Sequence, residues 1–130
     1  MMNENYSEPI RLAIVGSRNY KNWNEFKVKV EETLKIWDII PDQIETIVSG
    51  GASGADTLAQ LWASKNKIPM TIYPPDWNKH RRAAGPIRNT LIIKDATHVI
   101  AFPSKSGFGT QDSISKAKSQ GKPLKIHKID

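Results

Sequence analysis

Three short loops that contain glycine, two of them glycine-rich, hold the residue types that could bind a phosphate or a ribose. GSRNY starts at Gly16, SGGASGAD spans residues 49–56, and SGFGT spans residues 106–110. Glycine permits positive φ and close approach of another group to the backbone. The free N–H groups at the start of a helix attract anions. An apolar run precedes each loop and a helical pattern follows it, so we expect backbone amides to form an anion site here.

Polar side chains in the same loops could add charge and hydrogen bonds to that site. Arg18, which follows Ser17, could make a bidentate contact to phosphate. Asp56 could bind a ribose hydroxyl, or it could only complement the helix dipole. Thr110 could bind a phosphate oxygen or only cap its helix. The glycines could admit a ligand or only allow tight packing of helix on strand; they are Gly50, Gly51, Gly54, Gly107 and Gly109.

A further segment, PPDWNKHRRAAGPIRN at residues 74–89, adds cations and an aromatic ring. Arg88 and Asn89 follow a Gly-Pro pair that suits a helix start, so we expect them in a first helical turn facing the ligand. Trp77 could stack on a base or pack within its loop. The glycine loops lack the Lys-Ser/Thr of a P-loop, and His80 has no partner at metal-ligand spacing. We therefore expect neither a metal nor a resident cofactor.

Alternating strand-like and helical patterns would bring these loops together. Such alternation is typical of a parallel sheet with helices on both faces. We expect an α/β fold, a Rossmann-like three-layer sandwich with about five strands in the order 3-2-1-4-5. Its ligand would bind where the first and fourth strands end, which is where the three loops converge. Strands are predicted over residues 10–16, 44–50, 68–74, 97–103 and 122–129, and helices over 23–37, 54–67, 86–95 and 109–121.

Composition narrows the class of protein. The chain has 130 residues and no cysteine, which suits one domain over residues 10–130 after a flexible segment at 1–9. No signal core or apolar run of about 20 residues is present, so we expect a cytoplasmic protein that does not bind membranes. The net charge of +6 favours phosphorylated ligands. Nucleic acid is not expected as a partner, because the sequence lacks an arginine-rich block or a basic-aromatic strip.

Four segments in order resemble the YspA, cpYpsA-related family of the SLOG superfamily: IVGSRNY, IVSGGASGADTLAQLWA, IYPPDWNKHRRAAGPIRN and VIAFPSKSGFGTQDSISKAKSQGKPL. The resemblance covers about residues 10–128. The superfamily also contains the LOG phosphoribohydrolases and the DNA-processing protein DprA. The resemblance implies a Rossmann-like fold, a homodimer or higher homo-oligomer, and a pocket for a nucleotide or an ADP-ribose-like signal in bacterial or phage systems. It implies ligand contacts from Gly16, Ser17, Arg18, Gly50, Gly51, Gly54, Asp56, Arg88, Asn89, Gly107, Gly109 and Thr110.

The chain departs from the resembling enzymes at one catalytic position. The LOG signature P-G-G-x-G-T-x-x-E ends in a glutamate that stabilises the ribosyl cation, and Ser113 stands there in this chain. Asp112 is one position earlier, which on a helix turns the side chain by about 100°. Arg88 matches the enzymes' arginine. We therefore favour a protein that senses or sequesters its ligand. The alternatives are hydrolysis of a nucleoside monophosphate, with Asp56 or Asp112 as the carboxylate beside Arg88, and a nucleic-acid binder.

Overall fold

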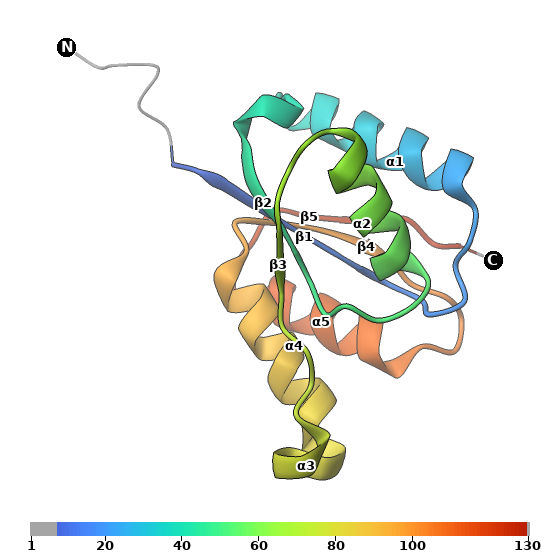
Figure 1. The fold of residues 1–130 in the computed structure, drawn as a ribbon, viewed down its shortest axis with the longest axis vertical. Coiled ribbons are helices and arrows are strands. Elements are labelled where there is room, and N and C mark those ends of the chain that lie inside the picture. Colours follow the sequence, from blue (N-terminus) through green and yellow to red (C-terminus); the bar gives the residue numbers. More distant parts are fainter. Residues whose placement is uncertain (1–7, 130) are drawn as a thin grey trace.

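A parallel sheet of five strands, in the order β3-β2-β1-β4-β5, forms the centre of the computed structural model, which describes residues 8–129 (Figure 1). This order confirms the predicted Rossmann-like architecture. The predicted flexible segment, residues 1–9, lies almost wholly outside the described residues. The strands are β1 (Ile10–Gly16), β2 (Ile44–Ser49), β3 (Met70–Ile72), β4 (His98–Phe102) and β5 (Leu124–Ile126).

Helices cover both faces of the sheet. α1 (Trp23–Ile36) and α2 (Ala55–Lys65) cover one face, and α4 (Ala84–Asp95) and α5 (Phe108–Ser119) cover the other (Figure 1). Successive residues of β1 divide between the two cores. Leu12 and Ile14 pack in the cluster beneath α1 and α2, whereas Ala13 and Val15 pack in the cluster beneath α4 and α5. A strand that is buried on both faces needs a continuous apolar run, which explains the pattern of β1.

The segment between β3 and α4 differs from the prediction of a polar loop. It forms α3 (Trp77–His80) and the 3-10 helix η2 (Arg81–Ala83), and a second 3-10 helix, η1 (Pro41–Gln43), precedes β2. Asp76 caps α3 by accepting a hydrogen bond from the amide of Lys79 at 3.1 Å. Because α4 begins at Ala84, Arg88 lies beyond the first helical turn in which it was predicted.

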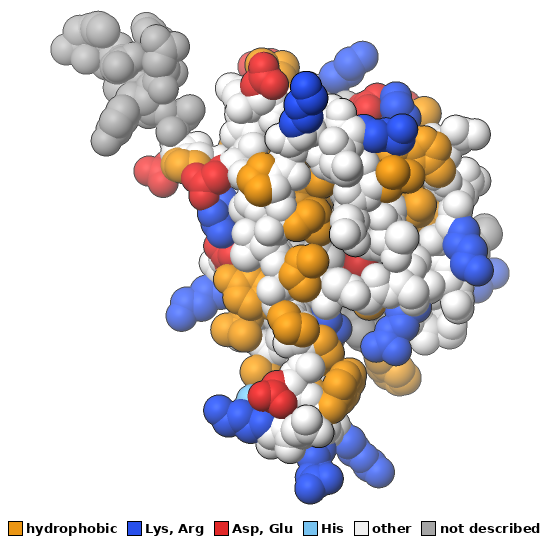
Figure 2. Space-filling model, in the orientation of Figure 1, with side chains coloured by type: hydrophobic (Ala, Val, Ile, Leu, Met, Phe, Trp, Pro, Cys, Tyr) orange, Lys and Arg blue, Asp and Glu red, His pale blue; other side chains and the backbone are white. Residues whose placement is uncertain are grey.

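The two edge strands are shorter than their apolar runs. β3 and β5 each contain three residues and, among the strands of residues 8–129, pair with a single neighbour. Hydrophobic side chains gather in a strip along β3 and down toward α3 (Figure 2). Ile72 on β3 is 43% exposed and Trp77 on α3 is 51% exposed. None of the helices within residues 8–129 is both long enough and apolar enough to cross a bilayer.

Candidate functional site

A cavity of about 310 Å³ opens at the carboxyl edge of the sheet, where β1 and β4 are paired. The loops after β1, β2 and β4 converge on it, as the strand order predicts for ligand sites of such sheets. Parts of α4 and α5 complete its walls. Ten residues with a predicted ligand role line it: Gly16, Ser17, Arg18, Gly50, Asp56, Arg88, Asn89, Gly107, Gly109 and Thr110.

The N-terminus of α5 faces this cavity. Gly107 is the N-cap, and no side chain caps the helix. Thr110 therefore lies inside the first turn, where it is buried, and is not the N-cap that it could have been if the helix began after it. The first N–H groups of a helix have no intrahelical partner, and the helix dipole adds positive potential there. A Cβ on Gly109 would meet no atom within 4 Å, so this backbone is open to a ligand.

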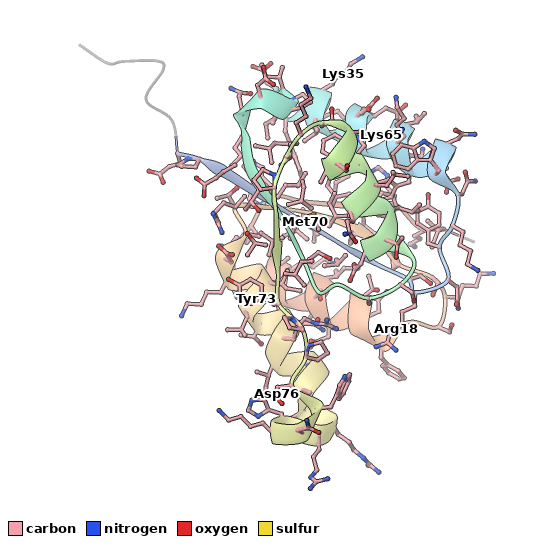
Figure 3. All side chains as sticks on the ribbon, viewed as in Figure 1. Arg18, Lys35, Lys65, Met70, Tyr73 and Asp76 are labelled. Carbon is pink, nitrogen blue, oxygen red and sulfur yellow. The ribbon has the colours of Figure 1, made fainter. Side chains whose placement is uncertain are left out.

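Two arginines add positive charge to the cavity. Arg88 reaches it from α4, where its Nη1 donates to the carbonyl oxygen of Gly50 at 3.1 Å and its Nε donates to Oδ1 of Asn89 at 3.0 Å. Arg18 projects from the loop after β1, on the side where α5 begins (Figure 3). Burial lowers the pKa of Arg88, the charge of Asp56 opposes this, and the charge of Arg18 adds to the lowering. An anionic ligand would offset the repulsion between the two guanidinium groups.

Asp56 both lines the cavity and shapes the loop before α2. Its Oδ2 accepts a hydrogen bond from the amide of Ala52 at 3.0 Å, which folds the loop back over the helix. Burial raises the pKa of the Asp56 carboxyl group, and the Ala52 amide and the charge of Arg88 act against that rise. Asp56 thus places a carboxyl group in the cavity lining, close enough to Arg88 for their charges to interact.

The glycines of the loop at residues 49–56 make room for the protein's own groups. A Cβ on Gly50 would lie 2.7 Å from Cζ of Arg88, inside van der Waals contact. A Cβ on Gly54 would overlap the backbone of Ser17 and Arg18. Gly54 and Gly51 have φ of +75° and +72° and do not line the cavity. The space these glycines leave is filled by an arginine and by the loop after β1.

Two other residues with predicted roles lie away from the cavity. The Oδ2 of Asp112 accepts hydrogen bonds from Nδ2 of Asn89 at 3.0 Å and from Nζ of Lys116 at 2.7 Å, so it joins α5 to α4. Ser113 lines the cavity in its place and is 1% exposed. Trp77 lies on α3 and is absent from the cavity lining. Within residues 8–129, no three His, Asp or Glu side chains are grouped to hold a metal ion.

Phe108 lines the cavity, although no role was predicted for it from the sequence. Its side chain is 91% exposed, which is unusual for a large apolar residue in a folded chain. The signal in the sequence was a phenylalanine between two glycines in a loop that follows a buried strand. An exposed ring beside cations is a surface on which a base can stack.

Known proteins resemble this chain either in sequence or in fold. The chain is 28% identical over 126 residues to the Gene 61 protein of Mycobacterium phage D29, covering 88% of this chain and 93% of that protein. The fold is similar to that of DprA from Streptococcus pneumoniae, with a TM-score of 0.68 and 19% identity over 90% of this chain. It is also similar to DprA from Helicobacter pylori, whose structure addressed its single-stranded DNA binding mode, with a TM-score of 0.59 and 23% identity over 91% of this chain.

The DprA proteins are longer than this chain. The aligned part spans 50% of the S. pneumoniae protein and 65% of the H. pylori protein, and the likeness is one of fold. A family model described as the YspA, cpYpsA-related SLOG family matches residues 10–80, which run from β1 to α3 and include the first two glycine loops. This match covers more than half of the chain, which therefore belongs to the YspA, cpYpsA-related SLOG family.

Proposed function

We propose that this protein binds a nucleotide or a nucleotide-derived ligand of the ADP-ribose kind, and that it senses or sequesters that ligand. One observation carries the proposal: the uncapped N-terminus of α5 meets Arg18 and Arg88 in a single cavity. Backbone amides at a helix N-terminus and guanidinium groups are the donors that bind phosphate in proteins. The SLOG family assignment agrees with a ligand at this edge of the sheet.

The remaining cavity residues match the other parts of a nucleotide. The Asp56 carboxylate can accept a hydrogen bond from a ribose hydroxyl, and the exposed ring of Phe108 can stack on the base. A volume of about 310 Å³ is at the lower end of the range of about 300–1,000 Å³ for small-molecule sites. The cavity thus has a donor set for phosphate, an acceptor for ribose and a ring for the base.

Calorimetric titration of AMP and ADP-ribose into the wild type and Arg18→Ala tests this proposal. Arg18 is exposed, so its removal leaves the core intact. Losing one charged hydrogen bond to phosphate should cost about 1.5–3 kcal/mol, which is a loss of roughly 10-fold to 150-fold in affinity. Arg82→Ala is the matched control, because Arg82 is also exposed but does not line the cavity. Equal affinities for the two variants would contradict the proposal.

The alternative function is hydrolysis of an N-glycosidic bond in the same cavity. Asp56 favours it, because a carboxylate in the cavity beside Arg88 could stabilise a ribosyl cation. Asp112 has the weaker geometry, since it bonds to Asn89 and Lys116. Chromatography of AMP after incubation separates the two functions. Intact AMP supports a binding protein, whereas free adenine that disappears in Asp56→Asn supports an enzyme.

The likeness to DprA also makes single-stranded DNA a candidate ligand, against the expectation from composition. Phe108 with Arg18 and Arg88 would provide a ring and two cations for a strand. A fluorescent oligo-dT titrated at increasing salt tests this candidate. Affinity that falls steeply with salt would indicate several phosphate contacts and favour DNA over a mononucleotide.

We further propose that two copies of the chain associate through the hydrophobic strip along β3. Ile72 of this strand is exposed, and β3 is an edge strand whose outer side pairs with no strand of residues 8–129. Exposed apolar side chains that gather on one surface favour association between proteins. A second copy would cover both the strip and the strand edge.

A further inference from the structure

A second cavity, of about 690 Å³, adjoins the first. It lies between the start of α1, the loop after β4 and the chain that follows β5. Four polar residues line both cavities and form a shared border: Ser17, Asn19, Ser104 and Ser106. A ligand in the first cavity therefore has a polar path into the second.

The walls of the second cavity are fixed by hydrogen bonds and packing. The hydroxyl group of Tyr20 donates to Oε1 of Glu25 at 2.7 Å. The amide of Ile129 donates to the carbonyl oxygen of Pro103 at 3.2 Å, which holds the chain after β5 beside the loop after β4. This contact positions Lys128 in the cavity lining. The cavity is thus built before any ligand enters it.

The lining of the second cavity suits a sugar and phosphate better than a base. Lys128 can contact a phosphate, and the second carboxylate oxygen of Glu25 can accept from a sugar hydroxyl. The ring of Tyr20 is buried and stacked on Phe102 with centroids 5.2 Å apart, so its faces are not open to a base. The first cavity, in contrast, has the exposed ring of Phe108.

We propose that the two cavities hold the two ends of one ligand, a nucleoside diphosphate sugar. The nucleotide end occupies the first cavity, and the diphosphate crosses the polar border. The second sugar lies beside Glu25, and the phosphate attached to it lies beside Lys128. This inference rests on the proposed nucleotide binding and assigns the second cavity to the sugar end of the ligand. It predicts that a ligand reaching both cavities binds more tightly than one that fills only the first.

Calorimetry with AMP and ADP-ribose as the two probes tests this inference on the full chain. The wild type should bind ADP-ribose about 10-fold more tightly than AMP, the difference that one added charged contact gives. Lys128→Glu should remove most of that difference and leave AMP affinity within about twofold. Lys125→Glu is the matched control, since Lys125 is exposed on β5 and lines neither cavity. It should change neither affinity.

The outcomes separate this inference from the proposed function. Equal wild-type affinities for AMP and ADP-ribose would overturn the second site and leave nucleotide binding in the first cavity intact. An equal loss for both probes in Lys128→Glu would do the same. Failure of both probes to bind the wild type would overturn the proposed function and this inference together.

Discussion

Replacing Gly54 by alanine tests whether this glycine serves packing between loops. Its φ of +75° is one that an alanine adopts at a cost of about 1–3 kcal/mol. The added Cβ would also overlap the backbone of Ser17 and Arg18, which cannot rotate away as a side chain can. Moving that loop would strain the hydrogen bond from the amide of Ala55 to the carbonyl oxygen of Ser17, 3.0 Å long and worth about 1 kcal/mol. We expect the free energy of unfolding to fall by about 2–4 kcal/mol.

Urea denaturation followed by circular dichroism measures this change, with Gly109→Ala as the matched control. Gly109 lies in the first turn of α5, and a Cβ there meets no atom within 4 Å. Alanine should therefore raise the free energy of unfolding by about 0.5 kcal/mol, because it restricts the unfolded chain. A Gly54→Ala variant within about 0.5 kcal/mol of the wild type, an amount typical of neutral surface changes, would refute the reasoning. An equal loss in both variants would refute it as well.

Three more predictions concern pH and assembly. Burial raises the folded-state pKa of Asp56 above its ordinary value of 3.8, so the free energy of unfolding should fall as the pH rises from 3.8 through the raised pKa. Urea denaturation at a series of pH values should show a smaller change for Asp56→Asn than for the wild type. His127 is partly buried, with its Nε2 2.8 Å from the hydroxyl oxygen of Thr33, and burial lowers its folded-state pKa. The free energy of unfolding should therefore fall as the pH drops below 6.5. A free energy of unfolding that depends on pH as steeply in His127→Gln as in the wild type would contradict this expectation. Sedimentation should show a wild-type dimer and an Ile72→Glu monomer, with exposed Val28→Glu on α1 remaining dimeric; a monomeric wild type would contradict the proposed interface.

The sheet and the position of its cavity could be predicted from the sequence because their signals are local. A continuous apolar run indicates a strand buried on both faces, and β1 has the predicted bounds of residues 10–16. The alternation of strands and helices then leaves few strand orders, and the observed order places three loops at one edge.

Roles that depend on distant residues could not be predicted in this way. Gly50 and Gly54 indicate that something approaches the backbone, but their neighbours are Arg88 and the loop after β1, far away in the sequence. Trp77 could stack on a ligand or pack within its loop, and the sequence did not show that Asp76 caps a short helix there, with Trp77 outside the cavity lining. The different direction of Asp112 could be predicted, because this residue is one position before the catalytic glutamate of the LOG signature. One residue turns a helical side chain by about 100°, and Asp112 accordingly bonds to Asn89 on α4.

The contact between Arg88 and Gly50 joins two positions that are 38 residues apart in the chain. A methyl group at residue 50 would overlap the guanidinium group, so the Arg88 side chain keeps its present position only beside a glycine. A shorter side chain at 88 would remove that requirement and permit alanine or serine at 50. Among related chains, these two positions should therefore vary together, even where no ligand touches residue 50. Glycine at the position of residue 50 would then mark the family members that keep an arginine in this cavity.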